Sequence, residues 1–356
     1  MLTGNKGEWS EAYTLLRLLA MGRLYAADEN LNKMDNMFFP VLKIYREEHE
    51  GATFEYTLAD GEKIDIFFND TLLKSIQRQQ FTAEADYLFN RILEGTDRAF
   101  AIDRTERFLA EIGCHKLAAS SADKTDIRMK LHDVQTGYNS DYGFSIKSEV
   151  GSAPTLINAG KPTNFIYKIT GLTSGDVAII NAINTPKKIQ DRMAYLFSHA
   201  QEVVFQKLYS DTFANNLMLL DSLMPQLLSC AILYHYRDGI SGCKEIVDKL
   251  EEENPLHFPR RGYYEYKFKK FLTAAALGMM PATNWDGIDE ANGGYIIVTR
   301  EGSVLAYHIY NRAFFEEYLL QNTKFERAST TRHDYAHVYE AERDMLINLN
   351  LQIRFK

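Results

Sequence analysis

The amino-acid sequence predicts an α/β protein of the mixed α+β kind, in which a mixed central sheet is flanked by helices. Three observations support this fold class. Apolar residues recur at helical spacing over residues 7–21, and they alternate at strand spacing over 124–148. A helical stretch rich in leucine and methionine over 187–253 precedes another alternating segment at 293–310, so the C-terminal region combines helices with a β-hairpin.

The first expected element is the helix over residues 7–21. Trp9, Leu15 and Leu19 follow helical spacing, and the acidic residues of the first turns suit the helix dipole. Glu11 shares a stripe with Leu15 and Leu19, so its carboxylate is expected at the buried edge, where it needs a partner. A metal ion would be such a partner. The alternative is a surface carboxylate that only compensates the dipole.

The elements that follow are assigned from the same two periodicities. Residues 54–68 alternate in part and contain an Ala-Asp-Gly turn, which predicts a hairpin. The other expected elements are short helical pieces over 26–50, helices over 83–94 and 103–112, strands over 115–119 and 164–170, a helix that Asn311 caps and that runs through Leu320, and a C-terminal strand over 346–354.

The central element is a predicted hairpin over 124–148. Apolar residues occupy alternate positions in both arms: Ile127, Met129 and Leu131 in the first, and Tyr142, Phe144 and Ile146 in the second. A two-residue turn at Thr136-Gly137 would place Ile127 opposite Ile146. This register gives the hairpin one unbroken apolar face and one polar face.

The same register gathers three chemically useful side chains on the polar face. Asp126 lies opposite Lys147, with Ser145 one pair away, so that a carboxylate, a hydroxyl and an ammonium stand together on a rigid sheet. Asp133 and Asp141 are competing carboxylates. Asp133 has the parity of the apolar side, and Asp141 lies too near the turn to face Ser145, so Asp126 is preferred.

These residue types suit metal-assisted hydrolysis of a phosphodiester. Mg²⁺ prefers carboxylate oxygens and keeps several of its waters. A metal-bound water is more acidic and can attack phosphorus, while the metal offsets the additional negative charge. A nearby lysine favours the ionised forms of its neighbours. The alternative interpretation is that Asp, Ser and Lys simply occupy the wet face of an ordinary antiparallel hairpin.

Several polar stretches are candidates for contact with DNA. Residues 256–270 interleave basic and aromatic side chains, which suits phosphate contact and base stacking. The C-terminal strand has an amide-rich face, and Asn or Gln can read adenine, and Arg guanine, in the major groove. Ordinary loops and solvated faces are the alternatives. The candidate DNA-binding residues are Lys6, Asn158, Lys161, Asn164, Arg260, Arg261, Lys267, Arg327, Arg332, His333 and Gln352.

Composition narrows the class of protein. A formal net charge of −8 argues against a basic coat for non-specific nucleic-acid binding, but a local basic surface is compatible with a DNA enzyme. Three widely spaced cysteines form neither a disulfide framework nor a zinc pair, which indicates a reducing cytoplasm. The N-terminus is no signal peptide, and the apolar run at 217–234 contains Asp221 and Pro225, so it is expected to be a buried helix without membrane contact. The sequence has no phosphate-binding glycine loop, nucleophile motif or metal-ligand His pair, which disfavours metabolic enzyme classes.

Four stretches together resemble the HpaII-type family of type II restriction endonucleases, in the PD-(D/E)xK nuclease superfamily. They are residues 4–11 (Gly-Asn-Lys-Gly-Glu-Trp-Ser-Glu), 143–148 (Gly-Phe-Ser-Ile-Lys-Ser), 329–333 and 349–355. The resemblance implies a PD-(D/E)xK restriction-endonuclease-like core and Mg²⁺-dependent cleavage of both strands of DNA at CCGG, which leaves 5′-phosphate ends. It also implies a homodimer and a cognate DNA methyltransferase that protects host DNA.

The family pattern assigns roles to individual residues. Asp126 is the metal carboxylate and Lys147 the catalytic lysine, while Ser145 stands where most superfamily members have an acid. A hydroxyl cannot supply the second negative charge, so Glu11 is the candidate replacement, with Glu8 or Glu149 as alternatives. The rival functions are a strand-nicking repair endonuclease of the same fold and a catalytically inactive DNA-binding protein.

The expected division of labour follows from this pattern. Because the sequence has no Pro/Gly-rich linker and no internal repeat, only a soft boundary is expected, near residue 200. Residues 1–200 would form the nuclease core with the catalytic hairpin. Residues 201–356 would form a helical and β-hairpin region that contributes DNA recognition, and the two could also be a single domain.

Overall fold

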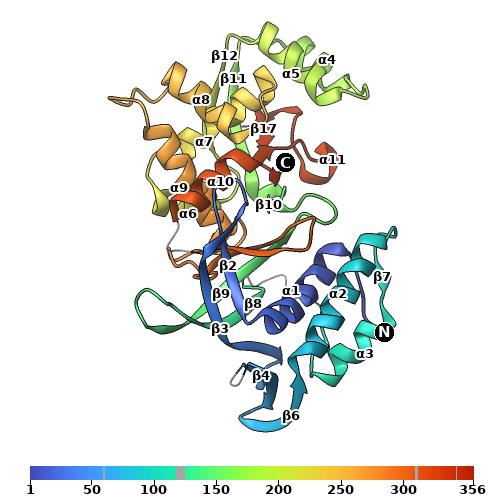
Figure 1. Cartoon of the computed structure of the whole chain (residues 1–356). Helices are drawn as coiled ribbons and strands as arrows, with labels where there is room; N and C mark the ends of the chain where they lie inside the picture. The colour runs from blue at the N-terminus through green and yellow to red at the C-terminus, as the bar shows by residue number, and fades with distance from the viewer. Residues whose placement is uncertain (59–60, 118–124, 309–311, 342) are drawn as a thin grey trace. The chain divides into compact units, whose positions relative to one another are not determined.

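The chain divides into two compact units. The computed structural model describes residues 1–58, 61–117, 125–308, 312–341 and 343–356 (Figure 1). The first unit comprises Met1–Pro154 and Asp289–Phe315, and the second comprises Thr155–Ile288 and Glu316–Lys356. The boundary expected near residue 200 therefore falls inside the second unit, because the chain leaves the first unit and later returns to it.

A nine-stranded sheet forms the centre of the first unit. Its strands are β2 (Arg23–Ala27), β3 (Lys33–His49), β4 (Ala52–Thr57), β5 (Lys63–Phe68), β6 (Thr71–Gln77), β8 (Ile127–His132), β9 (Asn139–Ser148), β13 (Gly294–Val298) and β14 (Val304–His308). Their order is β2-β14-β13-β9-β8-β3-β4-β5-β6, and a further pairing between β2 and β3 closes six of them into a ring. Strands β9 with β13 and β14 with β2 are parallel and the other neighbours antiparallel, so the mixed α/β class is confirmed.

Strand β3 is the largest departure from the expected elements, since short helical pieces were predicted over 26–50. It pairs with β2 up to Pro40 and then with β8 from Val41 to Tyr45. The change of partner falls at Pro40, which has no N–H to give to a ladder. An irregularity between Val41 and Lys43 then shifts the register. These two interruptions remove the regular alternation that identifies a strand from sequence.

Helix α1 (Lys6–Met21) matches the expected helix and covers the sheet. The Asn5 side chain accepts hydrogen bonds from the backbone of Gly7 and Glu8, and Glu8 Oε2 accepts one from Asn5 N at 2.7 Å, which makes a capping box. Its buried face, which includes Trp9 and Leu16, packs on β9 and on α2 (Arg78–Glu94), which lies beside it in Figure 1. This packing fixes the direction in which the next residue of the α1 stripe, Glu11, projects.

The remaining elements of the first unit follow the sequence closely. Helices α2 and α3 (Asp103–Glu111) and the hairpins β4–β5 and β13–β14 confirm four predicted elements, while β1 (Thr3–Gly4) pairs with β7 (Phe100–Ala101). Residues 115–117 form no strand, contrary to the expected strand over 115–119. Residues 118–119, two residues of the 59–61 turn and the capping residue Asn311 lie outside the described ranges.

The second unit has two small sheets surrounded by helices. Strands β11 (Asn164–Thr170), β12 (Glu202–Leu208), β16 (Val338–Ala341) and β17 (Asp344–Asn350) form an antiparallel sheet in the order β12-β11-β17-β16. Strands β10 (Thr155–Ile157), β15 (Thr323–Phe325) and β18 (Ile353–Phe355) form the other. The helices are η1 (Lys161–Thr163), α4 (Ser174–Ala182), α5 (Lys188–His199), α6 (Asp211–Leu220), α7 (Met224–Leu233), η2 (Tyr234–Asp238), α8 (Cys243–Glu253), α9 (Tyr263–Leu277) and α11 (Thr330–His333), and α10 (Arg312–Asn322) crosses the change of unit.

Two expectations for the second unit need correction. Strand β12 interrupts the stretch over 187–253 that was expected to be helical. The single C-terminal strand is two strands, β17 and β18, which belong to different sheets, and the break between them lies at Leu351 and Gln352. The amide-rich face of β17 is buried, since Asn348 is 4% and Asn350 2% exposed, so these two amides hold the unit together and do not face solvent.

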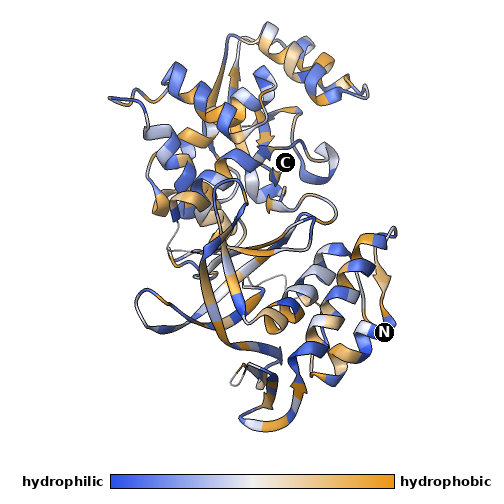
Figure 2. Cartoon of the chain, in the orientation of Figure 1, coloured by the Kyte–Doolittle hydropathy of each residue, from blue (hydrophilic) through white to orange (hydrophobic). Residues whose placement is uncertain are grey.

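Hydrophobic and hydrophilic residues interleave along the helices (Figure 2). Within the described ranges, no single helix has both the length and the apolar character needed to cross a membrane. The consecutive segments Asp211–Leu220 and Met224–Asp238 reach that length and composition only together, and they meet at a bend of 110°.

The buried histidine of η2 predicts a pH dependence of stability. His235 is 2% exposed, and burial lowers its pKa from 6.5 to about 4. The unfolded chain therefore binds a proton that the folded chain excludes, and stability is lost as the pH falls from about 6.5 towards 4. At pH 5 this difference in proton binding lowers the free energy of unfolding by about 2 kcal/mol relative to pH 7 and above. Urea unfolding of wild type and His235→Phe at pH 7 and 5 should show a smaller acid loss in the variant. His115→Gln, which changes an exposed ring, should behave as wild type, and equal acid losses in all three would contradict the assignment.

Candidate active site

The central hairpin forms with the predicted faces but with a different register. Ile127 lies opposite Phe144, and not opposite Ile146 as expected from a two-residue turn. The arms are joined by a longer loop from Asp133 to Tyr138, and the side chain of Asp133 accepts hydrogen bonds within this loop. The shift is two residues, so each side chain keeps its face.

The new register brings Asp126 next to Ser145. Asp126 N donates to Phe144 O at 2.9 Å, which extends the ladder by one residue beyond β8. Ser145 Oγ donates to Asp126 Oδ2 at 3.0 Å, and Lys147 Nζ donates to Ser145 Oγ at 2.9 Å. Ile146 N also donates to Asp126 Oδ2, at 2.6 Å. The carboxylate and the ammonium that the sequence placed together are thus linked through one hydroxyl.

The direction of these hydrogen bonds is fixed by their chemistry. An ammonium can only donate, so the Ser145 hydroxyl must accept from Lys147 and give its own proton to Asp126. Ser145 is 2% exposed, so water does not compete for these bonds. Lys147 Nζ also lies 5.4 Å from the ring centre of Tyr295 on β13, a favourable position for a cation. The lysine is therefore held in one place.

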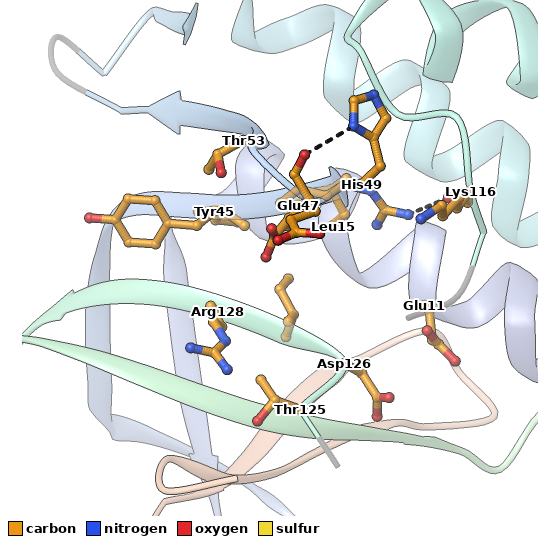
Figure 3. Close-up of a pocket in the computed structure, with 14 residues that line it drawn as sticks. Glu11, Leu15, Tyr45, Glu47, His49, Thr53, Lys116, Thr125, Asp126 and Arg128 are labelled. Carbon is orange, nitrogen blue, oxygen red and sulfur yellow. Dashed lines mark hydrogen bonds between the residues drawn. The ribbon is translucent and has the colours of Figure 1, made fainter. Parts of the chain in front are cut away.

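Glu11 lies beside this group and borders two cavities. The first, here called the acidic cavity after its four carboxylates, has a volume of about 480 Å³, and its lining includes Glu11, Glu47, Glu50 and Asp126 together with the cations Arg46, Lys116 and Arg128. The second, here called the lysine cavity, includes Lys6, Glu11, Arg98 and Lys147. Figure 3 shows Glu11 projecting from α1 on the same side of the acidic cavity as Asp126. Glu11 thus connects the carboxylate side of the site with the ammonium side.

Sequence reasoning missed Glu47, a further acid of the acidic cavity. Tyr45 lies opposite Arg128 in the antiparallel β3–β8 pair, and the same register carries Glu47 to the row of Asp126. The residue was missed because β3 was not identified as a strand. Burial, and then Asp141, raise the pKa of Tyr45 to about 12, so its phenol stays protonated at neutral pH and is no general base.

The competing acids lie elsewhere. Glu8 accepts the hydrogen bond that caps α1, and Asp133 accepts those of the hairpin loop. Asp141 lies 3.6 Å from Lys130 near the loop end of the hairpin. Glu149 is exposed after β9 and lines neither the acidic cavity nor the lysine cavity. Asp126 and Glu11 are therefore the predicted metal-binding acids that share a cavity.

The donor set suits a hard divalent cation that keeps part of its water shell. Among the described residues no three His, Cys, Asp or Glu are gathered closely enough to enclose a metal ion. Mg²⁺ is commonly held by only one or two carboxylates together with waters and substrate phosphates. The hydrogen bonds that Ser145 Oγ and Ile146 N donate to Asp126 both fall on Oδ2, which among the described residues leaves Oδ1 for a metal ion. Two carboxylates beside an open cavity therefore suit Mg²⁺. They differ from the closed set of four protein ligands that is typical of a structural zinc site.

Comparison with known proteins identifies the family of the chain. The family model of the HpaII restriction endonuclease matches residues 5–355. The chain belongs to the HpaII restriction endonuclease family. Type II restriction enzyme HpaII from Haemophilus parainfluenzae is 38% identical over 357 residues, which cover 99% of this chain and 98% of the relative. No solved structure matches.

Membership of the HpaII restriction endonuclease family identifies the class of reaction. The chain is a type II restriction endonuclease, a site-specific deoxyribonuclease whose substrate is DNA. Such enzymes generally use a divalent metal ion, in agreement with the acids of the site. The predicted family resemblance and enzyme class are therefore confirmed.

In this HpaII-family enzyme five predicted DNA-binding residues meet in a third cavity. We call it the basic cavity; it lies in the second unit and its lining includes Asn158, Arg327, Arg332, His333 and Gln352. Burial, and then Arg332, lower the pKa of His333, which favours its neutral ring. The cavity thus brings together three segments: the loop after β10, the residues in and before α11, and the residue pair that follows β17.

The other predicted DNA-binding residues of the HpaII-family enzyme have different surroundings. Lys161 lies 3.7 Å from Asp334, and Lys267 forms an ion pair with Asp221. Asn164 is fully buried, and its amide donates to the backbone oxygen of His333 at 3.0 Å. Lys6 borders the lysine cavity and its Nζ donates to Leu93 O at 3.3 Å, and the exposed Arg260 and Arg261 precede α9, where the Arg260 guanidinium lies 5.8 Å from the ring centre of Tyr263.

Proposed function

We propose that this enzyme cuts both strands of DNA at CCGG, uses Mg²⁺, and leaves 5′-phosphate and 3′-hydroxyl ends. The observation that supports the chemistry is the hydrogen-bonded chain Asp126–Ser145–Lys147 beside Glu11. A carboxylate at the start of one strand and a lysine on the next antiparallel strand, with an acid from the first helix, are the arrangement expected of a PD-(D/E)xK core. The recognition sequence is taken from the family resemblance.

In this proposal Asp126 and Glu11 hold the metal, which would acidify the attacking water and offset charge on the phosphate. Ile146 N and Ser145 Oγ fix the Asp126 carboxylate by bonding to its Oδ2. Lys147 places a positive charge where negative charge develops on the phosphate, and Ser145 accepts from the ammonium and so holds it in position. Lys6 and Arg98, which border the lysine cavity, would neutralise a neighbouring phosphate of the same strand.

The proposed biological setting is a restriction–modification pair. The enzyme would act in the cytoplasm as a homodimer, because a two-fold assembly matches the symmetry of a palindrome. A cognate DNA methyltransferase would protect the host copies of the same sequence. The supporting observation is the 38% identity to a type II restriction enzyme over nearly the whole of both chains.

The ligand assignment predicts different effects for two acids of α1. Glu11→Gln should lower the cleavage rate by about 100-fold and raise the Mg²⁺ concentration needed for half-maximal activity, because a neutral amide is a weak ligand for Mg²⁺. Glu8→Gln, which removes only part of a capping box, should cost about 1 kcal/mol of stability or less and leave cleavage near wild type. Magnesium titrations of plasmid cleavage test both. Unchanged magnesium dependence in Glu11→Gln would exclude Glu11 as a metal ligand and would leave Glu47 as the candidate second acid.

Cleavage of a plasmid of known sequence tests the proposed function. The purified protein should be inactive in EDTA, become active with Mg²⁺, and cut every CCGG to linear products with labelled ends that carry 5′-phosphate. Plasmid methylated at CpG should resist cutting. Accumulation of nicked circles alone would support the strand-nicking rival. Binding without cleavage in Mg²⁺ or Mn²⁺ would support an inactive DNA-binding protein.

A further inference from the structure

Three of the polar side chains that line the basic cavity, Asn158, Arg332 and Gln352, make no side-chain hydrogen bond or ion pair within the described residues. We propose that this cavity is the base-reading site of the enzyme, in which Arg332, Gln352 and Asn158 contact base edges of duplex DNA. This inference rests on the proposed function, because it takes duplex DNA as the ligand. It separates the residues that choose the sequence from those of the first unit that cut it.

The three side chains are available for a ligand. Within the described residues none of Arg332, Gln352 and Asn158 makes a side-chain hydrogen bond or ion pair, although all three border the cavity. Arg332 is exposed. A guanidinium and two amides that are solvated in the free protein can exchange water for base edges without breaking bonds inside the protein.

The backbone that carries these side chains is held by buried asparagines. Asn350 Nδ2 donates to Gly160 O at 2.8 Å and to Asn164 Oδ1 at 2.6 Å, which ties the strand before Gln352 to the loop after Asn158. Asn164 Nδ2 donates to His333 O at 3.0 Å, which ties the same network to the residue after Arg332. Three segments that are distant in sequence are therefore pinned at one point. A rigid support of this kind is what precise recognition needs.

Arg327 belongs to the support and not to the readers. Its Nη2 donates to His235 O at 3.0 Å, and its guanidinium lies 5.7 Å from the ring centre of Tyr236. These contacts direct Arg327 towards the interior of the second unit, although its side chain also borders the cavity. We therefore assign base reading to Arg332 and a positioning role to Arg327.

The chemistry of the three readers matches base edges. The planar fork of an arginine can donate two parallel bonds to O6 and N7 of guanine in the major groove. Each amide offers a donor and an acceptor, so Gln352 and Asn158 can pair with edges that present either. Phosphate contact is the other use of Arg332, and it would contribute equally to every DNA sequence.

The test compares binding to two duplexes, one containing the sequence that wild type is found to cut and one with that sequence scrambled. Binding is measured by fluorescence anisotropy in EDTA, so that no DNA is cut. The variants are Arg332→Lys, which keeps the charge but loses the fork, Gln352→Ala and Asn158→Ala. The control is Lys207→Ala, which removes an exposed cation of β12 that borders none of the three cavities described.

Arg332→Lys should weaken binding to the duplex that contains the cut sequence by about 10- to 100-fold, because one bidentate base contact contributes about that much discrimination. Binding to the scrambled duplex should stay within about twofold of wild type. Cleavage in Mg²⁺ should then spread to sites with one altered base. Gln352→Ala and Asn158→Ala should also weaken binding to the cut sequence more than binding to the scrambled duplex, but by smaller factors. Lys207→Ala should show no such difference between the two duplexes. Equal weakening on both duplexes would make Arg332 a phosphate contact, and no change in the three variants would remove the cavity from recognition. A wild type that cuts no DNA would instead overturn the proposed function.

Discussion

Lys147→Met is expected to lower the single-turnover rate of DNA cleavage by about 100- to 10,000-fold, because in the proposed mechanism its ammonium offsets the negative charge that develops on the phosphate. Methionine keeps much of the aliphatic length but can neither donate to Ser145 nor balance negative charge on the phosphate. Binding to the uncleaved duplex in EDTA should remain within about tenfold of wild type, since one phosphate contact contributes only part of the affinity.

The matched control for this change is Lys130→Met on the same hairpin. Lys130 lies 3.6 Å from Asp141 and borders neither the acidic cavity nor the lysine cavity. Its replacement should leave cleavage within a few fold. Retained cleavage in Lys147→Met, with thermal stability equal to wild type, would remove Lys147 from the mechanism.

Asp126→Asn is also expected to slow cleavage strongly, because it weakens the binding of the metal ion. The amide oxygen can still accept from Ile146 N and Ser145 Oγ, so the hairpin should fold, but the negative charge that attracts a cation is lost. The rate should fall by at least about 100-fold, and more Mg²⁺ should be needed for the activity that remains.

DNA binding separates this variant from a misfolded one. In EDTA a carboxylate in the cleavage site repels the phosphates, so Asp126→Asn should bind duplex DNA as tightly as wild type or more tightly. Asp141→Asn, at the exposed loop end of the hairpin, is the control and should cut normally. Normal magnesium dependence in Asp126→Asn would show that the metal is held elsewhere.

The grouping of Asp126, Ser145 and Lys147 could be predicted from sequence, because the face on which a strand side chain lies survives an error of two residues in register. The expected turn was two residues long, whereas the loop runs from Asp133 to Tyr138, and the pairing is displaced accordingly. Strand side chains alternate with a period of two, so a displacement by two keeps every residue on its face. Asp126, Ser145 and Lys147 were therefore placed together correctly although their cross-strand partners were not.

Other features could not be derived because they depend on partners distant in sequence. Glu47 enters the acidic cavity only through the pairing of β3 with β8, and β3 lost its alternation at Pro40 and at an irregular register. The asparagines of β17 looked like a solvent-exposed face, but they are buried and bonded inside the unit: Asn350 donates to Gly160 O and Asn164 Oδ1, and Asn348 donates to Asp334 O. Periodicity shows that one face of a strand differs from the other, and it does not show which face is covered.

The return of the chain to the first unit has a consequence for synthesis. Strand β9, which carries Lys147, lies between β8 and β13, and β13 follows it by well over a hundred residues in the sequence. During synthesis one edge of β9 stays unpaired until Gly294–Val298 has left the ribosome. Until then the Lys147 ammonium also lacks the Tyr295 ring beside it. A chain that stops before this strand therefore lacks one of the two neighbours of β9 and the Tyr295 ring beside Lys147, although Asp126, Ser145 and Lys147 are all present.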